Sequence, residues 1–484
     1  MRGNAIIKIM LTRLAKIIIV LILLTALLAA LAWWWFDRAG LPAVSESPSG
    51  ASNGIFPGGA LKSLFNNLTG NDDANPVEGG EGAVAIGTGN QVAPRFRRVA
   101  VGPVTDLARV GPPTGGSSAT LVYLERDTGH LYRLGASGES ERLSNTTIPQ
   151  TFQLIAATPA PTPVAKTKTA TTTVTLIIRH FKDGRLQNFL TSIKFVATAA
   201  GLSAEAGAAA GDFFVSTNPL ATPAGEAGDS ASLSPLSGQF IPADITNLAV
   251  SPDQKNFAFL AVRDGEGQIG TVDLAFKKAA TVFSSPLREW RIYWPTLTSL
   301  VLATRPSGLV PGYAYRLDLS SKQLTRLVDR VNGLEILPSP NGRRWLYSGT
   351  DERGGSPFLA LYDLSTQQLT RVPTGGLADK CVWTGDSTRL FCAAPSSFPS
   401  TSVGAGSAAV YPDDWLAGDI TLNDKIWQIE AASGQSQLVF DPALASPAVN
   451  LDVWKLALNP AEDGLYLINK NDLSLWSLRL GSEF

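Results

Sequence analysis

The segment Ala249-Val-Ser-Pro-Asp-Gln-Lys-Asn-Phe257 decides the fold, because three altered copies of it follow along the chain. The copies are Tyr293-Trp-Pro-Thr-Leu-Thr-Ser-Leu300, Leu337-Pro-Ser-Pro-Asn-Gly-Arg-Arg-Trp345 and Val382-Trp-Thr-Gly-Asp-Ser-Thr-Arg-Leu390. The steps between equivalent residues are 44, 44 and 45 for Val250, Trp294, Pro338 and Trp383. A fixed period of this length, with short strands in every unit, predicts a β-propeller.

Each unit is expected to form four antiparallel strands. Residues 245–250 alternate in polarity as a two-faced strand does, and Ser251-Pro-Asp-Gln254 supplies the residues of a tight turn. An apolar run at 257–262 gives a second strand, a third ends at Asp273, and Leu324–Leu327 is typical of a fourth, outer strand. Such a sheet buries its faces only against neighbouring sheets, so the units are expected to stack in a ring.

Two incomplete units mark the ends of the ring. Phe96–Ala100 matches the fourth-strand pattern without three strands before it, while the last unit, 451–480, has three strands and no fourth. The two parts are expected to complete one blade and close the ring. With earlier units starting near Leu121 and Thr151, the fold class is an all-β propeller over 95–484 with seven blades, or six if the second unit is not a blade.

Three insertions interrupt the repeats. The segments near 159–172 and 197–238 have low-complexity compositions. The segment near 394–421 falls between the second and third strands of the sixth unit. It is therefore expected on the face of the ring opposite to the one that carries the first two insertions. It carries the residues that we predict to bind a partner, Tyr411, Asp413, Asp414 and Trp415. The alternative is an acidic turn whose tryptophan packs on its own blade.

The N-terminal region predicts a membrane anchor. Residues 17–36 carry no charge, and twenty residues at about 1.5 Å each span a bilayer core of about 30 Å. Residues 1–16 are basic and are expected to stay in the cytoplasm, which places the propeller outside it. Trp33, Trp34 and Trp35 would then lie at the outer membrane interface. A cleaved signal peptide ending near Ala32 is the alternative.

Residues 37–94, rich in Gly, Ser and Pro, are expected to form a flexible tether between the anchor and the propeller. Leu61, Leu64, Phe65 and Leu68 have the spacing of a short amphipathic helix, although chance composition explains that spacing equally well.

Charge and composition exclude several functions. Lys and Arg total 40 against 41 Asp and Glu, so no attraction to nucleic acid is expected. The two histidines, His130 and His180, lack metal-ligand spacing. The segment Gly50-Ala-Ser-Asn-Gly54 matches a nucleophile-elbow pattern but lies in the tether, without a strand and helix around it. We therefore expect no catalytic residue, metal or cofactor.

The two cysteines are placed to form a disulfide. Cys381 and Cys392 flank the turn at Asp386, in the register that also pairs Trp383 with Leu390. Residues opposite each other in a hairpin have the separation that a disulfide needs, and an exterior location allows oxidation. Two packed thiols are the alternative.

The Ser-Pro-Asp-x-Lys-x-Phe and Ser-Pro-Asn-Gly-Arg-Arg-Trp units resemble the WD40-like (PD40) repeats of TolB-type propellers. The layout of the whole chain resembles bacterial single-pass membrane proteins with an external propeller, in segments that include 125–130, 144–149 and 411–415. The resemblance implies the fold and leaves the activity open.

Two functions remain as hypotheses. The first is a membrane-anchored, extracytoplasmic binding or scaffold module for a protein or an envelope polymer. The second is a hydrolase or lyase that acts on glycans, which would need carboxyl groups about 5–10 Å apart at the propeller axis.

Overall fold

The computed structural model describes residues 95–100, 102–111, 119–135, 138–159, 171–198, 201–204, 235–402 and 407–481. The predicted anchor at 17–36, Trp33, Trp34 and Trp35 within it, and the tether at 37–94 all lie outside these ranges. Within the described ranges, no helix has the length and the apolar character needed to cross a membrane.

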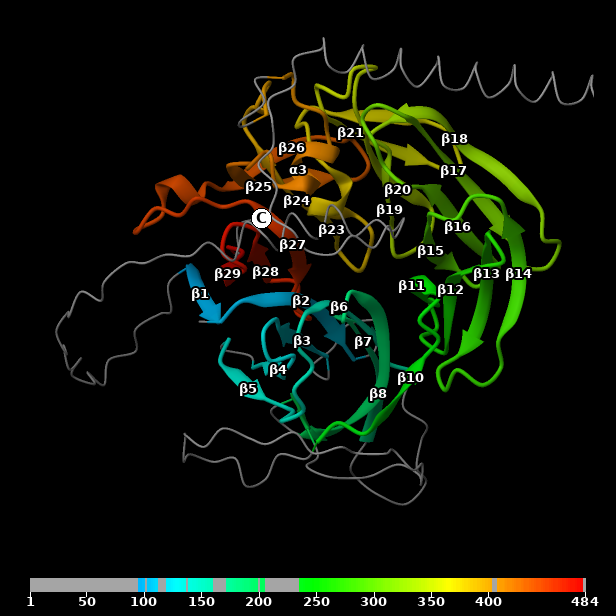
Figure 1. Ribbon diagram of the computed structural model, residues 1–484. Helices are drawn as coiled ribbons and strands as arrows, with labels where there is room; N and C mark the ends of the chain where they lie inside the picture. Colours follow the sequence, from blue (N-terminus) through cyan, green and yellow to red (C-terminus); the bar gives the residue numbers. More distant parts are fainter. Residues whose placement is uncertain are drawn as a thin grey trace, which may run out of the picture. The chain divides into compact units, whose positions relative to one another are not determined.

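The strands of the described residues form seven antiparallel sheets arranged as the blades of a propeller, so the predicted seven-bladed fold is confirmed. The first strand of each blade lies near the centre of the ring and the fourth lies toward the outside (Figure 1).

Blades one to three occupy the N-terminal part of the ring. Blade one is β2 (Val104–Val110), β3 (Thr120–Glu125), β4 (Leu131–Leu134) and β5 (Ser140–Arg142). Blade two is β6 (Thr151–Ala157), β7 (Thr171–Lys182), β8 (Arg185–Thr198) and β10 (Gly238–Ile241), and β9 (Gly201–Ala204) pairs with β8. Blade three is β11 (Ile245–Val250), β12 (Asn256–Arg263), β13 (Glu266–Asp273) and β14 (Ala280–Ser285).

Blades four to seven complete the ring. Blade four is β15 (Trp290–Thr296), β16 (Ser299–Thr304), β17 (Pro311–Asp318) and β18 (Leu324–Asn332). Blade five is β19 (Glu335–Pro338), β20 (Arg344–Gly349), β21 (Phe358–Asp363) and β22 (Leu369–Val372). Blade six is β23 (Cys381–Trp383), β24 (Arg389–Pro395), β25 (Asp424–Glu430) and β26 (Ser436–Phe440), with η2 (Ala378–Lys380) before it and α3 (Asp413–Ala417) in its insertion. Blade seven is β27 (Val453–Leu458), β28 (Gly464–Asn469), β29 (Leu475–Arg479) and β1 (Phe96–Ala100), preceded by η3 (Pro442–Leu444).

Strand β1 closes the ring, as the incomplete units predict. It pairs with β29, with Phe96 opposite Leu478. The Phe96 ring also stacks on Trp476 at a centroid distance of 4.7 Å. The seam between the first and last strands is therefore held by backbone pairing and by aromatic packing.

The repeated polar residues stabilise the turns. In blade three the Ser251 hydroxyl accepts hydrogen bonds from the backbone N–H groups of Lys255 and Asn256. At the turn after the third strand of blade four, the Asp318 carboxylate accepts hydrogen bonds from Ser320 and Ser321, which lower its pKa to about 2. These side chains therefore maintain the shape of each blade.

Cys381 and Cys392 lie opposite each other on β23 and β24 and form a disulfide in the structure. The bond closes a loop with a sequence separation of only 11 residues. Chain-entropy arguments limit its stabilisation to about 2–3 kcal/mol.

Replacing both cysteines with serine is therefore expected to leave the ring folded and to lower its melting temperature only slightly. Hydrogen exchange should increase mainly in the β23–β24 hairpin. Mass spectrometry of non-reduced protein from an oxidising compartment tests the premise, and two free thiols would contradict it.

Candidate functional site

Every blade contributes one polar residue at the same position of its innermost strand, or directly before that strand. The steps of 44, 44 and 45 residues that align the repeats also connect Asn247, Arg291, Glu335 and Lys380. In the other blades the equivalent residue follows a bulge in the first strand. We call these residues the axial ring: Asp106, Gln153, Asn247, Arg291, Glu335, Lys380 and Lys455.

The axial ring connects neighbouring blades. Asp106 Oδ2 accepts a hydrogen bond from the backbone of Leu154 at 2.9 Å, and Asn247 Oδ1 accepts one from Ile292 at 3.1 Å. Lys455 Nζ lies 3.2 Å from Asp106 Oδ1, which joins the last blade to the first. These contacts give the axial ring a structural role in holding the blades together.

Two carboxyl groups converge on one arginine in this ring. Arg291 Nη1 lies 2.6 Å from Asp379 Oδ2 and 4.0 Å from Glu335 Oε1, so the two oxygens are no further apart than the sum of these distances. The Asp379 side chain is 37% exposed, whereas the Glu335 side chain has no exposure. Two neighbouring carboxyl groups are what glycan hydrolysis needs, but Glu335 has no access to a substrate in this structure.

Burial, followed by the charge of Asp379, raises the pKa of Glu335 to about 8. Its carboxyl group is therefore protonated at neutral pH when the protein is folded. The Ser348 hydroxyl lies 3.4 Å from Glu335 Oε2, and the backbone N–H of Asp379 donates to the same atom at 3.3 Å.

Glu335 is expected to make stability depend on pH. The unfolded chain loses this proton near the ordinary pKa of 4.5, whereas the folded chain keeps it up to about pH 8. The unfolded state therefore binds fewer protons between these values, and the free energy of unfolding falls as pH rises, by up to about 1.36 kcal/mol per pH unit.

Glu335→Gln does not titrate, so urea unfolding from pH 5 to pH 8 should show a flatter decline in this variant than in the wild type. Exposed Glu266→Gln is the control and should keep the wild-type slope. An unchanged slope in Glu335→Gln would contradict the buried, protonated state.

A buried charged network anchors the blade-six insertion to blade seven. Lys380 Nζ lies 2.6 Å from Asp424 Oδ2 and 2.8 Å from Asp452 Oδ1. Asp452 also accepts a hydrogen bond from Trp415 Nε1 at 2.9 Å, and Lys470 Nζ donates to the Trp415 carbonyl oxygen. Both lysine amines lie over the Trp415 ring, at 4.6 and 5.0 Å from its centroid.

Burial and the neighbouring charges act in opposite directions in this network: burial alone would lower the pKa of Lys380, but the carboxylates of Asp424 and Asp452 raise it. Burial raises the pKa of Asp424 to about 6, although Lys380 beside it acts in the opposite direction. Burial also lowers the pKa of Lys470 to about 8. The network holds α3 through Trp415 and the start of β25 through Asp424.

The two aromatic residues predicted to meet a partner are internal. Tyr411 and Trp415 are each only 1% exposed. The Tyr411 hydroxyl donates to the Pro399 carbonyl oxygen at 2.8 Å, and the Trp415 ring packs against Trp454 of blade seven at 5.6 Å. The alternative expectation, a turn whose tryptophan packs internally, therefore describes Trp415 better. The residue on which Trp415 packs, however, belongs to the next blade and not to its own.

The two predicted aspartates shape the same loops. Asp413 Oδ2 accepts a hydrogen bond from the backbone of Gly308 in blade four at 2.6 Å. Asp414 Oδ2 accepts one from Val410 at 2.8 Å and a second from the Ser402 hydroxyl. Direct partner contacts by these four residues remain a prediction, while their observed contacts build the loop face.

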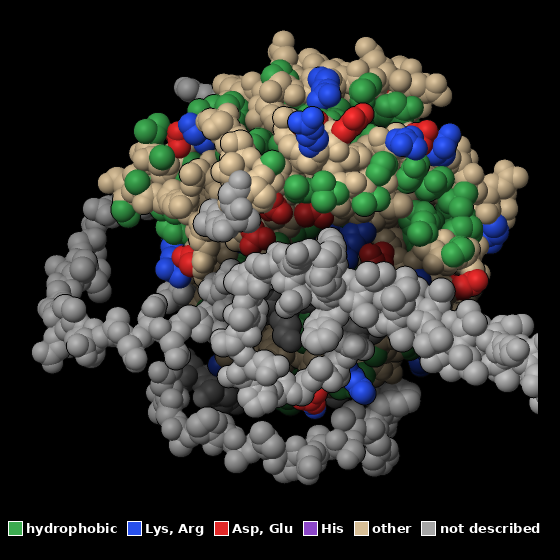
Figure 2. All heavy atoms as spheres, turned by 45° about the horizontal axis from the view of Figure 1, so that its top comes forward, with side chains coloured by type: hydrophobic (Ala, Val, Ile, Leu, Met, Phe, Trp, Pro, Cys, Tyr) green, Lys and Arg blue, Asp and Glu red, His purple; other side chains and the backbone are tan. Residues whose placement is uncertain are grey.

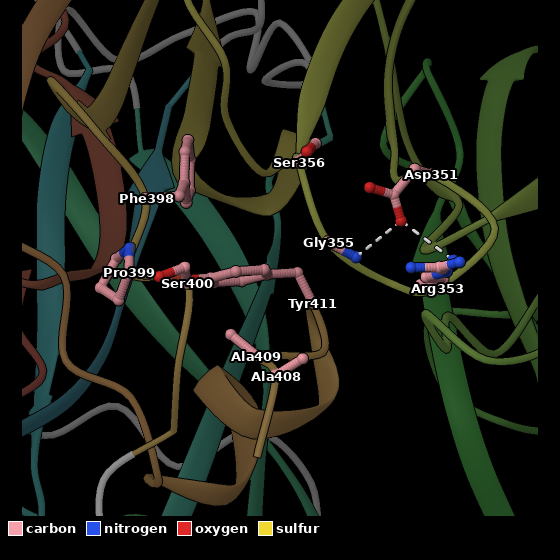
Figure 3. Close-up of a pocket in the computed structure, with 10 residues that line it drawn as sticks. All are labelled: Asp351, Arg353, Gly355, Ser356, Phe398, Pro399, Ser400, Ala408, Ala409 and Tyr411. Atoms are coloured by element: carbon pink, nitrogen blue, oxygen red, sulfur yellow. Dashed lines mark hydrogen bonds between the residues drawn. The ribbon is translucent and has the colours of Figure 1, made fainter. Parts of the chain in front are cut away.

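A pocket of about 420 Å³ opens between the insertion and the β20–β21 loop of blade five. Its wall combines apolar and polar side chains: Asp351, Arg353, Gly355, Ser356, Phe398, Pro399, Ser400, Ala408, Ala409 and Tyr411. Figure 3 shows the Tyr411 ring extending across the pocket toward Pro399 and Ser400, with the blade-five loop on the other side. We call this cavity the loop-face pocket.

The geometry of the loop-face pocket is defined by backbone contacts. Asp351 Oδ1 accepts hydrogen bonds from the N–H groups of Arg353 and Gly355, which holds the blade-five loop in a tight turn (Figure 3). The Tyr411 backbone N–H donates to Gly354 at 2.8 Å and joins the two walls. The exposed Arg353 guanidinium makes no hydrogen bond or ion pair with any residue that the structure describes.

The histidines lie apart from this pocket. His130 Nε2 contacts Arg142 Nη2 at 2.9 Å on blade one, and His180 is buried in blade two. In the part of the chain that the structure describes, no group of three or more His, Cys, Asp or Glu residues could hold a metal ion. On the face shown in Figure 2, basic and acidic side chains are interspersed among the described residues.

No family model matches the sequence, and no curated protein matches it. Several solved structures have a similar arrangement at low sequence identity. Oligogalacturonate lyase in complex with manganese has a TM-score of 0.44 and 9% identity, over 78% of this chain and 97% of that one. The GH74 enzyme of Niastella koreensis has a TM-score of 0.46 and 11% identity, over 79% and 53%. TolB from Acinetobacter baumannii has a TM-score of 0.30 and 13% identity, over 68% and 80%. Similarities at this level do not indicate what this chain binds.

Proposed function

We propose that the propeller is a binding module that holds a protein partner at the loop-face pocket. The observation that carries this proposal is the composition of the pocket lining: half-buried Phe398 and buried Ala409 are apolar, while the exposed lining residues include charged and hydroxyl side chains (Asp351, Arg353 and Ser356). Protein interfaces combine an apolar centre with a polar rim in the same way. An anionic envelope polymer would bind best to a basic surface. The numbers of basic and acidic residues in the chain are nearly equal, which favours a protein partner over such a polymer.

The same proposal places the propeller outside the cytoplasm, tethered by residues 17–36. The support is the uncharged run and the basic segment before it. A reporter that is active only outside the cytoplasm should work when fused after Phe484. Activity only of a cytoplasmic reporter at that position would contradict the location.

Crosslinking pulldown of the full chain tests the binding function. Ala408 is exposed at the pocket rim, so Ala408→Trp should fill the pocket without disturbing the core. We expect a protein to be crosslinked to the wild type and lost from Ala408→Trp. Gln437→Trp on the outer strand β26 is the control, and equal capture by both variants would contradict the proposal.

A glycan-acting enzyme is the second candidate, because Glu335 and Asp379 converge on Arg291. The full burial of Glu335 makes us expect no turnover of glycans by the purified protein. If the wild type hydrolysed or eliminated glycans and both Glu335→Gln and Asp379→Asn lost that activity, the enzyme would become the first candidate and the binding module the second.

A further inference from the structure

The loop face also carries an exposed apolar projection. Leu309 and Val310, in the β16–β17 loop of blade four, are 65% and 62% exposed. Among the described residues, this is the one place where two strongly exposed large apolar side chains are adjacent in sequence. Single exposed apolar residues are ordinary on protein surfaces, and an adjacent pair enlarges the apolar area that a partner could cover. We call Leu309 and Val310 the apolar knob.

The base of the apolar knob is fixed in position. The backbone N–H of Gly308 donates to Asp413 Oδ2 at 2.6 Å, and the Gly308 carbonyl accepts a hydrogen bond from Asn332 Nδ2 at 2.8 Å. A fixed base lowers the entropy lost when the knob is bound.

The base of the apolar knob packs against the backbone that carries the loop-face pocket. A Cβ atom at Gly308 would lie 2.5 Å from the Tyr411 carbonyl oxygen and 2.9 Å from Gly354 Cα. Tyr411 lines the pocket, and Gly354 stands in the sequence between the lining residues Arg353 and Gly355. The same face of the propeller therefore carries an exposed apolar pair and a partly apolar pocket on loops whose backbones are in contact.

We infer that a second copy of this chain is the partner, with the apolar knob of each copy inserted into the loop-face pocket of the other. A surface with both elements is complementary to itself, which is the condition for a two-fold symmetric dimer. The inference rests on the proposed function of the pocket and names its occupant.

Pocket size and charge support a second copy as the occupant. A volume of about 420 Å³ lies within the range of protein sites that enclose small molecules, so it can accept aliphatic side chains. At the rim, Glu352 and Arg353 are both exposed and opposite in charge. A two-fold axis can place the Arg353 of each copy near the Glu352 of the other, which favours this pairing.

Sedimentation of the full chain in detergent tests the inference through complementary variants. Val310→Asp removes the knob and leaves the pocket, whereas Ala408→Trp fills the pocket and leaves the knob. Each variant alone should dimerise about tenfold or more weakly than the wild type. A mixture of the two variants should form a mixed dimer more tightly than either variant self-associates, because one knob–pocket contact is intact. Leu444→Asp, at a residue 84% exposed elsewhere, is the control and should dimerise like the wild type.

A photo-crosslinking residue at position 310 distinguishes a second copy of this chain from a different protein partner. An adduct of twice the chain mass, mapped to 398–411 of the second copy, supports the inference. An adduct with a different protein overturns it and leaves the proposed function intact. A wild type that is monomeric at every concentration, without any adduct at position 310, also overturns the inference, while the Ala408→Trp pulldown independently decides the proposed function.

Discussion

Replacing Asp452 with alanine is expected to lower the free energy of unfolding by about 3–5 kcal/mol. Asp452 is buried and contacts the Lys380 amine at 2.8 Å, the Trp415 indole N–H at 2.9 Å and the Leu422 backbone N–H at 3.2 Å. Without Asp452, the Lys380 amine keeps only Asp424 of its two carboxylate partners. The Trp415 indole N–H and the Leu422 backbone N–H then lose their acceptor. A buried group that loses its partner keeps the full cost of desolvation, which explains the expected size of the effect.

Chemical denaturation of the full chain measures this loss. Asp329→Ala is the matched control, because Asp329 is 48% exposed and pairs with Arg326 at 3.5 Å on the surface. An exposed ion pair contributes about 0–1 kcal/mol, so the control should unfold almost like the wild type. Equal effects of the two substitutions would show that the buried network does not stabilise the junction of blades six and seven.

Trp415→Ala is expected to be similarly destabilising, at about 3–5 kcal/mol. The ring is 1% exposed, packs on Trp454 and lies beneath the amines of Lys380 and Lys470. Its removal leaves a cavity under α3 and exposes two buried amines to each other. Because α3 begins only two residues after Tyr411, the loop-face pocket should also lose its shape.

Trp415→Phe separates packing from hydrogen bonding. It keeps most of the buried ring but removes the indole N–H that bonds to Asp452, so we expect a loss of about 1–3 kcal/mol. Hydrogen exchange over 398–422 should increase strongly in Trp415→Ala and modestly in Trp415→Phe. A Trp415→Ala protein with wild-type stability and exchange would contradict the anchoring role.

The fold was predictable from sequence because its main signals are local and repeated. The alternation at 245–250 and the turn at Ser251 specify a strand and a reversal, and their recurrence in four units specifies a propeller, while the number of blades stayed open between six and seven. The innermost strand of blade one, β2 at Val104–Val110, was missed. It lacks the Ser-Pro turn of the later repeats, so the alignment gave it no equivalent.

The candidate site was less predictable because the residues that contact one another there are far apart in the sequence. Lys380 and Asp452 are 72 residues apart, and one sequence does not show which lysine meets which aspartate. The position of the insertion predicted which face carries Tyr411 and Trp415. Their burial depends on contacts with blades five and seven, which no local pattern encodes.

The central claim is that a protein partner binds the loop face, and photo-crosslinking from the two faces of the propeller tests it most directly. One crosslinker replaces Ser356 at the pocket rim and the other replaces exposed Lys255, in a turn on the opposite face. In cells that express the full chain, we predict a discrete protein adduct from position 356 and none from position 255. Adducts from position 255 alone, or equal adducts from both positions, would contradict the claim.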